Sequence, residues 1–218
     1  MYRFKSSLVA ALALLSLVCA QRPSFAQDSG GPRAQTPAGD DAFELVGQVL
    51  NVPMTPNSKQ YGYLSFVNGV DDVFSGGPQN ETTALFTFFT EAATTRVINN
   101  GSLRIVNRTG TTTVYFDDTP DGNFADPETF RDGTPVLTMS LRQQVILDLV
   151  EGTFTTVNFN TVTSAPSFSA GGERVRLGKE RDQFRTFISG RTNTTGTPAG
   201  FVIAGYAVAI EPANPGPQ

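Results

Sequence analysis

The sequence predicts a single all-β domain, an antiparallel β-barrel or β-sandwich of roughly nine to ten strands, with the barrel slightly preferred. Three observations support this fold class. Hydrophobic residues make up 39% of the 218 residues and charged residues 17%, which is enough apolar material for a core. Apolar and polar residues alternate in many short runs, as in half-buried strands. Gly, Asn, Asp and Pro separate these runs at hairpin-like distances, which favours antiparallel pairing.

The first 26 residues are typical of a secretory signal peptide. Arg3 and Lys5 precede an apolar run over residues 8–20, which is too short to span a bilayer as a helix. Small residues at Ser24 and Ala26 favour cleavage before Gln27. A second cleavage site follows Ala20. We therefore expect a protein secreted to the periplasm or the extracellular space, without a transmembrane anchor.

Residues 27–41 lack apolar periodicity and are rich in Gly, Pro and Asp, so they are predicted to form a flexible linker. Residues 42–210 form the predicted domain, because no linker-like composition interrupts them. Residues 211–218 form a Pro-rich tail that we expect to be disordered.

The first half of the domain contains short predicted strands that end at turn residues. They include residues 43–51, 61–67, 83–91, 95–98, 102–106 and 111–116. Residues 83–91 are apolar on both faces, which indicates a central or covered strand. Asn100-Gly101 is a strong hairpin signal because both residue types tolerate a positive φ.

Residues 135–150 are compatible with a strand or a helix. Apolar residues occupy most odd positions from Leu137 to Leu149, while Thr134-Pro135 and Gly152 resemble helix start and stop signals. The long period-2 alternation favours a strand, followed by a turn at Glu151-Gly152 and a further strand over residues 153–163. Strands are also expected over residues 174–177, 183–189 and 200–209. A continuous strand of this length favours a barrel.

Several classes of chemistry are excluded by composition. The chain has no His, so a His-based triad or His metal ligands are impossible, and its single Cys, Cys19, cannot form a disulfide within the chain. Cleavage after Ala26 removes Arg3, Lys5 and Arg22, which leaves 13 basic residues against 20 acidic ones and a net charge of −7. An acidic protein of this kind is not expected to bind nucleic acid.

Residues 117–128, DDTPDGNFADPE, form a candidate calcium loop. Calcium prefers several carboxylate and amide oxygens in a flexible loop with a sharp turn. The candidate ligands are Asp117, Asp118, Asp121, Asn123, Asp126 and Glu128. The spacing partly matches an EF-hand loop, but Thr119, Ala125 and the preceding strand depart from it. The alternative is a pair of ordinary turns, since Thr-Pro-Asp-Gly and Asp-Pro are typical turn sequences.

Two carboxylates would suffice for glycoside hydrolysis, so a carboxylate-only hydrolase is one possible function. The candidates are Glu81, Glu91, Asp148 and Glu151. Asp148 lies within an apolar run where burial would raise the pKa of its carboxyl, although the alternation places it on the solvent face.

Many of the 17 Phe residues fall on predicted strands, where they would fill a barrel or line an apolar cavity. We expect a secreted, non-enzymatic module with a binding or structural role, stabilised by calcium if the acidic loop is a site. The alternatives are a barrel that binds or converts a small hydrophobic ligand, and the hydrolase. The corresponding partners are an extracellular polymer, an apolar small molecule or a second copy of the chain.

Overall fold

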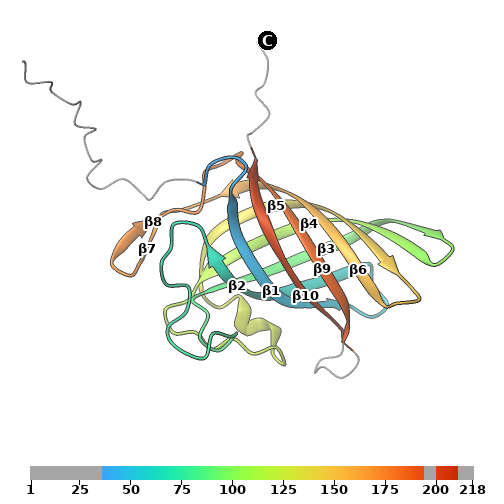
Figure 1. Ribbon diagram of the computed structural model, residues 1–218, viewed down its shortest axis with the longest axis horizontal. Helices are drawn as coiled ribbons and strands as arrows, with labels where there is room; N and C mark the ends of the chain where they lie inside the picture. The colour runs from blue at the N-terminus through green and yellow to red at the C-terminus, as the bar shows by residue number, and fades with distance from the viewer. Residues whose placement is uncertain (1–35, 194–199, 211–218) are drawn as a thin grey trace, which may run out of the picture. The chain divides into compact units, whose positions relative to one another are not determined.

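The computed structural model describes residues 36–193 and 200–210, and its main feature is a closed barrel (Figure 1). The predicted signal peptide, the predicted tail and all but the last six residues of the predicted linker lie outside the described residues. The barrel strands are β1 (Asp41–Asn51), β2 (Asn57–Val67), β3 (Phe86–Asn100), β4 (Leu103–Phe116), β5 (Thr134–Asp148), β6 (Thr153–Ser164), β9 (Gln183–Asn193) and β10 (Gly200–Ile210). A separate hairpin comprises β7 (Phe168–Ala170) and β8 (Glu173–Val175), and a 3₁₀ turn, η1, covers Pro127–Phe130.

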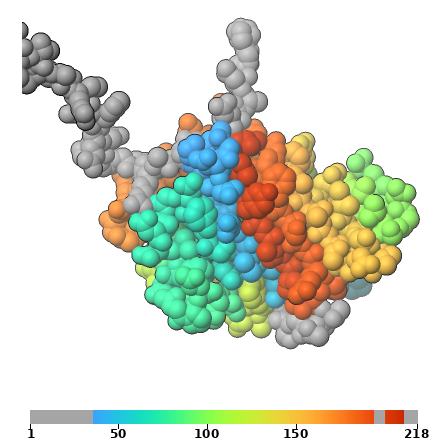
Figure 2. Space-filling model, in the orientation of Figure 1, coloured from blue at the N-terminus to red at the C-terminus, as the bar shows by residue number. Residues whose placement is uncertain are grey.

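Every barrel strand pairs with its neighbours in antiparallel fashion, in the order β1-β10-β9-β6-β5-β4-β3-β2. The barrel closes where β1 pairs with β10, from Asp41 opposite Val208 to Val49 opposite Phe201. These two strands run side by side in Figures 1 and 2. Closure satisfies the backbone hydrogen bonds that an open sheet would leave at its edges. The predicted all-β barrel is therefore confirmed.

Strand boundaries differ from the prediction mainly in β3 and β4. The segment predicted at residues 83–91, from Phe86 onward, and the segment at 95–98 form one strand, with a register shift between Thr94 and Arg96. The segments at 102–106 and 111–116 are likewise joined in β4. Asn100 still pairs with Leu103, so the turn consists of Gly101, with φ of 59°, and Ser102. The hairpin was predicted correctly, but its turn lies one residue later.

The strand interpretation of residues 135–150 is correct, since β5 covers Thr134–Asp148. Its odd-numbered side chains from Leu137 to Val145 are buried and the even-numbered ones from Ser140 to Ile146 are exposed. Among these buried odd-numbered residues Gln143 is the polar one; its side chain faces inward and is only 2% exposed. In β5 this alternation therefore separates side chains that face the barrel interior from side chains that face outward.

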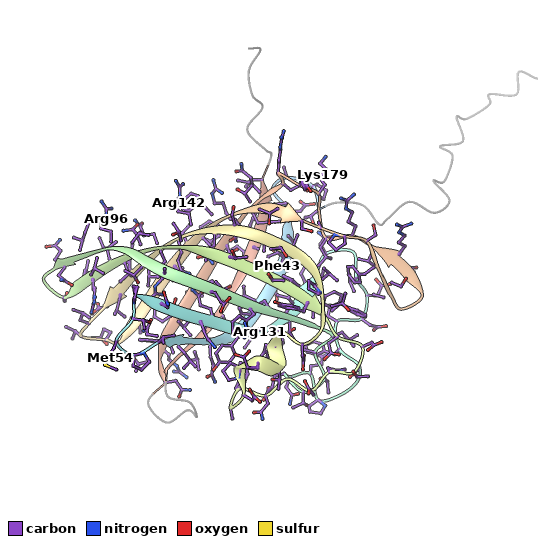
Figure 3. All side chains as sticks on the ribbon, turned by 180° about the vertical axis from the view of Figure 1, so that it is seen from behind. Phe43, Met54, Arg96, Arg131, Arg142 and Lys179 are labelled. Carbon is purple, nitrogen blue, oxygen red and sulfur yellow. The ribbon has the colours of Figure 1, made fainter. Side chains whose placement is uncertain are left out.

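One end of the barrel is filled by large apolar side chains, and we call it the closed end. Phe86, Leu137 and Val114 are almost completely buried there. Phe168 of β7 adds a cover from outside the barrel, with its ring centroid 6.0 Å from Phe86 and 5.3 Å from Phe116. Figure 3 shows Phe43, which also contacts Phe184, within this region. The β7–β8 hairpin lies at this end, opposite the projecting tip of the β3–β4 hairpin (Figure 1).

Residues 117–133, which we call the acidic loop, connect β4 to β5 and cover the outer wall at β2 and β3. The rings of Phe124 and Phe130 pack on Tyr61, at centroid distances of 6.2 Å and 5.3 Å. The Tyr61 hydroxyl donates to the Phe124 carbonyl at 3.3 Å. Phe89, on the outer face of β3, belongs to the same buried cluster. This cover explains why residues 83–91 are apolar on both faces.

Candidate functional site

A layer of polar side chains crosses the middle of the barrel interior. We call it the polar belt, and it comprises Gln60, Thr90, Thr112, Gln143, Asn158, Asn160 and Thr186. Gln60 and Gln143 exchange two hydrogen bonds, of 3.1 Å and 3.2 Å, across the barrel. The Gln143 amide also donates to Asn158 Oδ1 at 3.0 Å. Because buried polar groups require partners, this network favours the register in which Gln60 of β2, Gln143 of β5 and Asn158 of β6 lie at the same level of the barrel.

Beyond the polar belt, at the open end of the barrel, the interior contains a cavity of about 480 Å³. Its apolar walls come from β1, β3, β4, β5, β6, β9 and β10, through Val49, Val97, Val106, Val145, Leu147, Phe154, Ile188, Phe201 and Ile203. Its floor is Gln60, Gln143 and Thr156. Pockets that hold small organic molecules occupy about 300–1,000 Å³ and share this pattern of apolar walls with a few polar groups.

A glycine makes room for one aromatic wall of the cavity. A Cβ at Gly190 would lie 2.2 Å from Cζ of Phe154, because the Phe154 ring lies across the β9 backbone at this position. The ring also contacts Phe201 edge-on at a centroid distance of 5.4 Å. Any larger residue at position 190 would therefore clash with the Phe154 ring.

Two arginines of β4, Arg104 and Arg108, face the same cavity. The Arg108 guanidinium is held by neutral oxygens: Nη2 donates to Asn51 Oδ1 at 2.8 Å, Nη1 to Gln143 Oε1 at 3.4 Å and Nε to Thr94 Oγ1 at 3.4 Å. Burial lowers the pKa of Arg108, and the positive charge of Arg104 lowers it further. Arginine stays protonated in proteins, so the group remains charged at neutral pH.

The acidic loop brings together only part of the predicted calcium ligand set. Carboxylate oxygens of Asp117, Asp121 and Asp132 lie within 4.8 Å of one another. Asp132 follows η1 and was not among the predicted ligands. Desolvation raises the pKa of the Asp132 carboxyl, and the negative charges of Asp121 and Asp117 contribute to the increase. Three oxygen donors at this spacing resemble part of a calcium coordination shell.

Three other predicted ligands have local structural roles. Asn123 Oδ1 accepts from the Ala125 N–H at 2.9 Å, and Asp126 Oδ1 caps η1 by accepting from the Glu128 N–H at 3.2 Å. Glu128 forms ion pairs with Lys59, at 3.1 Å, and with Arg131. Bonding to Lys59 lowers the pKa of Glu128. Asp118, the last predicted ligand, is exposed and is not part of the three-carboxylate group.

Asp148, the preferred acid of the hydrolase hypothesis, closes the β5–β6 turn. Its Oδ1 accepts from the N–H groups of Val150, at 2.9 Å, and Glu151, at 3.2 Å. It borders a groove on the outer wall, beside Leu103 and Ile146, and does not line the inner cavity. Glu91 pairs with Arg131 on the outer wall, at 3.7 Å. These carboxylates have structural contacts and do not converge on the cavity.

Sequence reasoning did not select Arg104, Arg108 or Gln143 as site residues. A signal was present in each case. Arg104, Val106 and Arg108 share one face of β4, and Gln143 interrupts an apolar inner face. Polar residues at inward positions are costly unless they are paired or functional, so these interruptions point to the interior site.

Comparison of the chain with models of known families, with curated proteins and with solved structures found no match. The fold itself is an eight-stranded antiparallel barrel with one closed end and one open end that contains the cavity of about 480 Å³. In the described part of the chain, none of the helical segments has the length and hydropathy needed to cross a membrane.

Proposed function

We propose that this protein binds a small, largely apolar molecule in the open end of its barrel. The observation that carries the proposal is the cavity of about 480 Å³, whose walls are apolar side chains from seven strands. At its closed end the same barrel is filled by large apolar side chains such as Phe86 and Leu137. Empty apolar volume is costly to stability, so its retention at one end favours a role in binding.

Binding is favoured over catalysis by the residues at this site. Among the described residues that line the cavity, the ionisable side chains are Arg104 and Arg108 only. General acid–base catalysis uses groups that exchange protons near the working pH, and arginine stays protonated. The proposed action is therefore non-covalent capture, which agrees with the binding alternative that the sequence predicts.

The proposal is tested by titrating the purified protein with N-phenyl-1-naphthylamine, an uncharged fluorophore that brightens in apolar surroundings. We expect saturable binding to the wild type and its loss in Val106→Phe, because Val106 lines the cavity. Ile105→Phe is the matched control, since the neighbouring side chain points to the outer face of β4. Absence of binding to the wild type, or equal binding by both variants, would show that the cavity is not a ligand site.

A secreted location is part of the proposal. Its support is the pattern of residues 1–26, with Arg3 and Lys5 before an apolar run and Ala26 before Gln27. Mass spectrometry of the exported protein should give an N-terminus at Gln27. An intact N-terminus at Met1 in the mature protein would contradict it.

A further inference from the structure

The charge at the open cavity is not balanced by the residues around it. No Asp or Glu is present among the described residues that line the cavity. The ion pairs found in the described part of the barrel join Lys59 and Arg131 to Glu128 and Glu91, all on the outer wall. Arg108 therefore places a partly buried positive charge beside an apolar surface, an arrangement that an anion would favour, and exposed Arg104 adds a second positive charge nearby.

The hydrogen-bond inventory of Arg108 leaves donors free for such an anion. A guanidinium has five N–H groups, and three are used by Asn51, Gln143 and Thr94. The two that remain are on Nη1 and Nη2, one on each nitrogen. A carboxylate can accept from both terminal nitrogens at once, in the two-pronged geometry that arginine favours.

The arginine is also held in position before any ligand arrives. Its three partners are on β1, β3 and β5, and the Gln143 oxygen that it contacts also accepts from Gln60. A side chain fixed in this way loses little conformational freedom on binding, which favours affinity. Arg104, which is exposed, lies on the same inner face of β4 nearer its start and supplies a second positive charge.

We infer that the ligand of this barrel is an amphipathic carboxylate, with its carboxylate bound by Arg108 at the polar floor and its apolar body along the cavity walls. This inference rests on the proposed function and specifies its ligand class. It predicts selectivity for an acid over the uncharged alcohol of the same chain length, because both fill the walls equally and only the acid pairs with Arg108.

The test is displacement of N-phenyl-1-naphthylamine by decanoate and by decan-1-ol at neutral pH. We expect decanoate to bind the wild type about tenfold or more tightly than decan-1-ol, because hydrogen bonds to charged groups are the stronger class. Equal affinity for the two would overturn the inference. If the fluorophore itself fails to bind, the proposed function fails instead, so the two failures are distinguishable.

Variants then assign the selectivity to a residue. Arg108→Gln is expected to bind decanoate about tenfold or more weakly while retaining its affinity for decan-1-ol and for the fluorophore, which verifies an intact cavity. Arg96→Gln is the matched control. It removes the same charge from the same hairpin, but Arg96 points away from the barrel in Figure 3 and does not line the cavity. Loss of decanoate selectivity in Arg96→Gln, or its retention in Arg108→Gln, would contradict the assignment.

Discussion

The two ends of this barrel are built from the same eight strands, yet one is filled and the other is open. On β4, Val114 at the closed end is 1% exposed, while Val106 at the open end is 9% exposed and borders a cavity of about 480 Å³. The filled end uses Phe86, Leu137 and the cover provided by Phe168. At the open end, Val97, Val106 and Val145 leave room beside Phe154 and Phe201, and Arg108 faces the same space. Pairing of β1 with β10 closes the barrel, but the volume of the inward side chains decides whether each level is filled.

The polar belt is the boundary between these ends. Substitutions that break its hydrogen bonds should cause the largest loss in the free energy of unfolding. Gln143→Leu removes one partner each from Gln60, Asn158 and Arg108, all of them at least half-buried. We expect a loss of about 2–4 kcal/mol in the free energy of unfolding, because unpaired buried polar groups keep their full desolvation cost. Urea denaturation measures this. In the double variant Gln60→Leu/Gln143→Leu the loss should be smaller than the sum of the single losses, and additivity would show that the two amides act independently.

A matched pair of substitutions on β4 sharpens the comparison of the two ends. Val114→Ala should lower the free energy of unfolding by about 2–3 kcal/mol, because it creates a cavity in a filled region. Val106→Ala should cost about 1 kcal/mol or less, because the side chain already borders empty space. Denaturation midpoints of the two variants give the difference directly. Equal losses would indicate that the open cavity is filled in solution.

The acidic loop lies outside the barrel wall, so changes to it should have the smallest effect on the stability of the protein. The pKa of Asp132 is raised, first by desolvation and then by its acidic neighbours, so its ionisation opposes folding. The contribution of protonated Asp132 to the free energy of unfolding is therefore present at low pH. It is lost as the pH rises through the pKa of Asp132 in the folded protein. Calcium at about 5 mM should therefore raise the melting temperature at neutral pH if the loop is a site, as extracellular modules bind in this range.

Asp132→Asn should remove this calcium response and slightly stabilise the calcium-free protein, by less than about 1 kcal/mol because the group is exposed. Asp118→Asn is the control, since Asp118 is exposed and lies outside the three-carboxylate group. A calcium response that persists in Asp132→Asn, or disappears in Asp118→Asn, would contradict the assignment. Absence of any response in the wild type would leave the loop as a structural cover for β2 and β3.

Much of the fold follows from local sequence. The alternation from Leu137 to Val145 predicts a strand and assigns each side chain to a face, and β5 confirms both. Turn residues such as Gly101 and Gly152, with φ of 59° and 66°, mark where hairpins reverse. The missed joins within β3 and β4 occur where Thr-rich stretches and Gly110 resemble breaks, while pairing with both neighbouring strands keeps the chain extended.

The sequence by itself determined most of the strands, the faces of the side chains in a strand such as β5, and the absence of His and disulfide chemistry. Only the tertiary structure decided which inward residues share a level of the barrel. That level depends on register between strands far apart in the chain, as for Gln60 and Gln143, which are 83 residues apart. Long-range register also leaves Arg108 with neutral partners beside an open cavity. The shorter-range pairing of Phe116 with Thr134 closes the acidic loop and brings Asp132 to Asp117 and Asp121. Periodicity specifies the face of a strand on which each side chain lies. The residues that share a site depend on how the strands are paired and in which register.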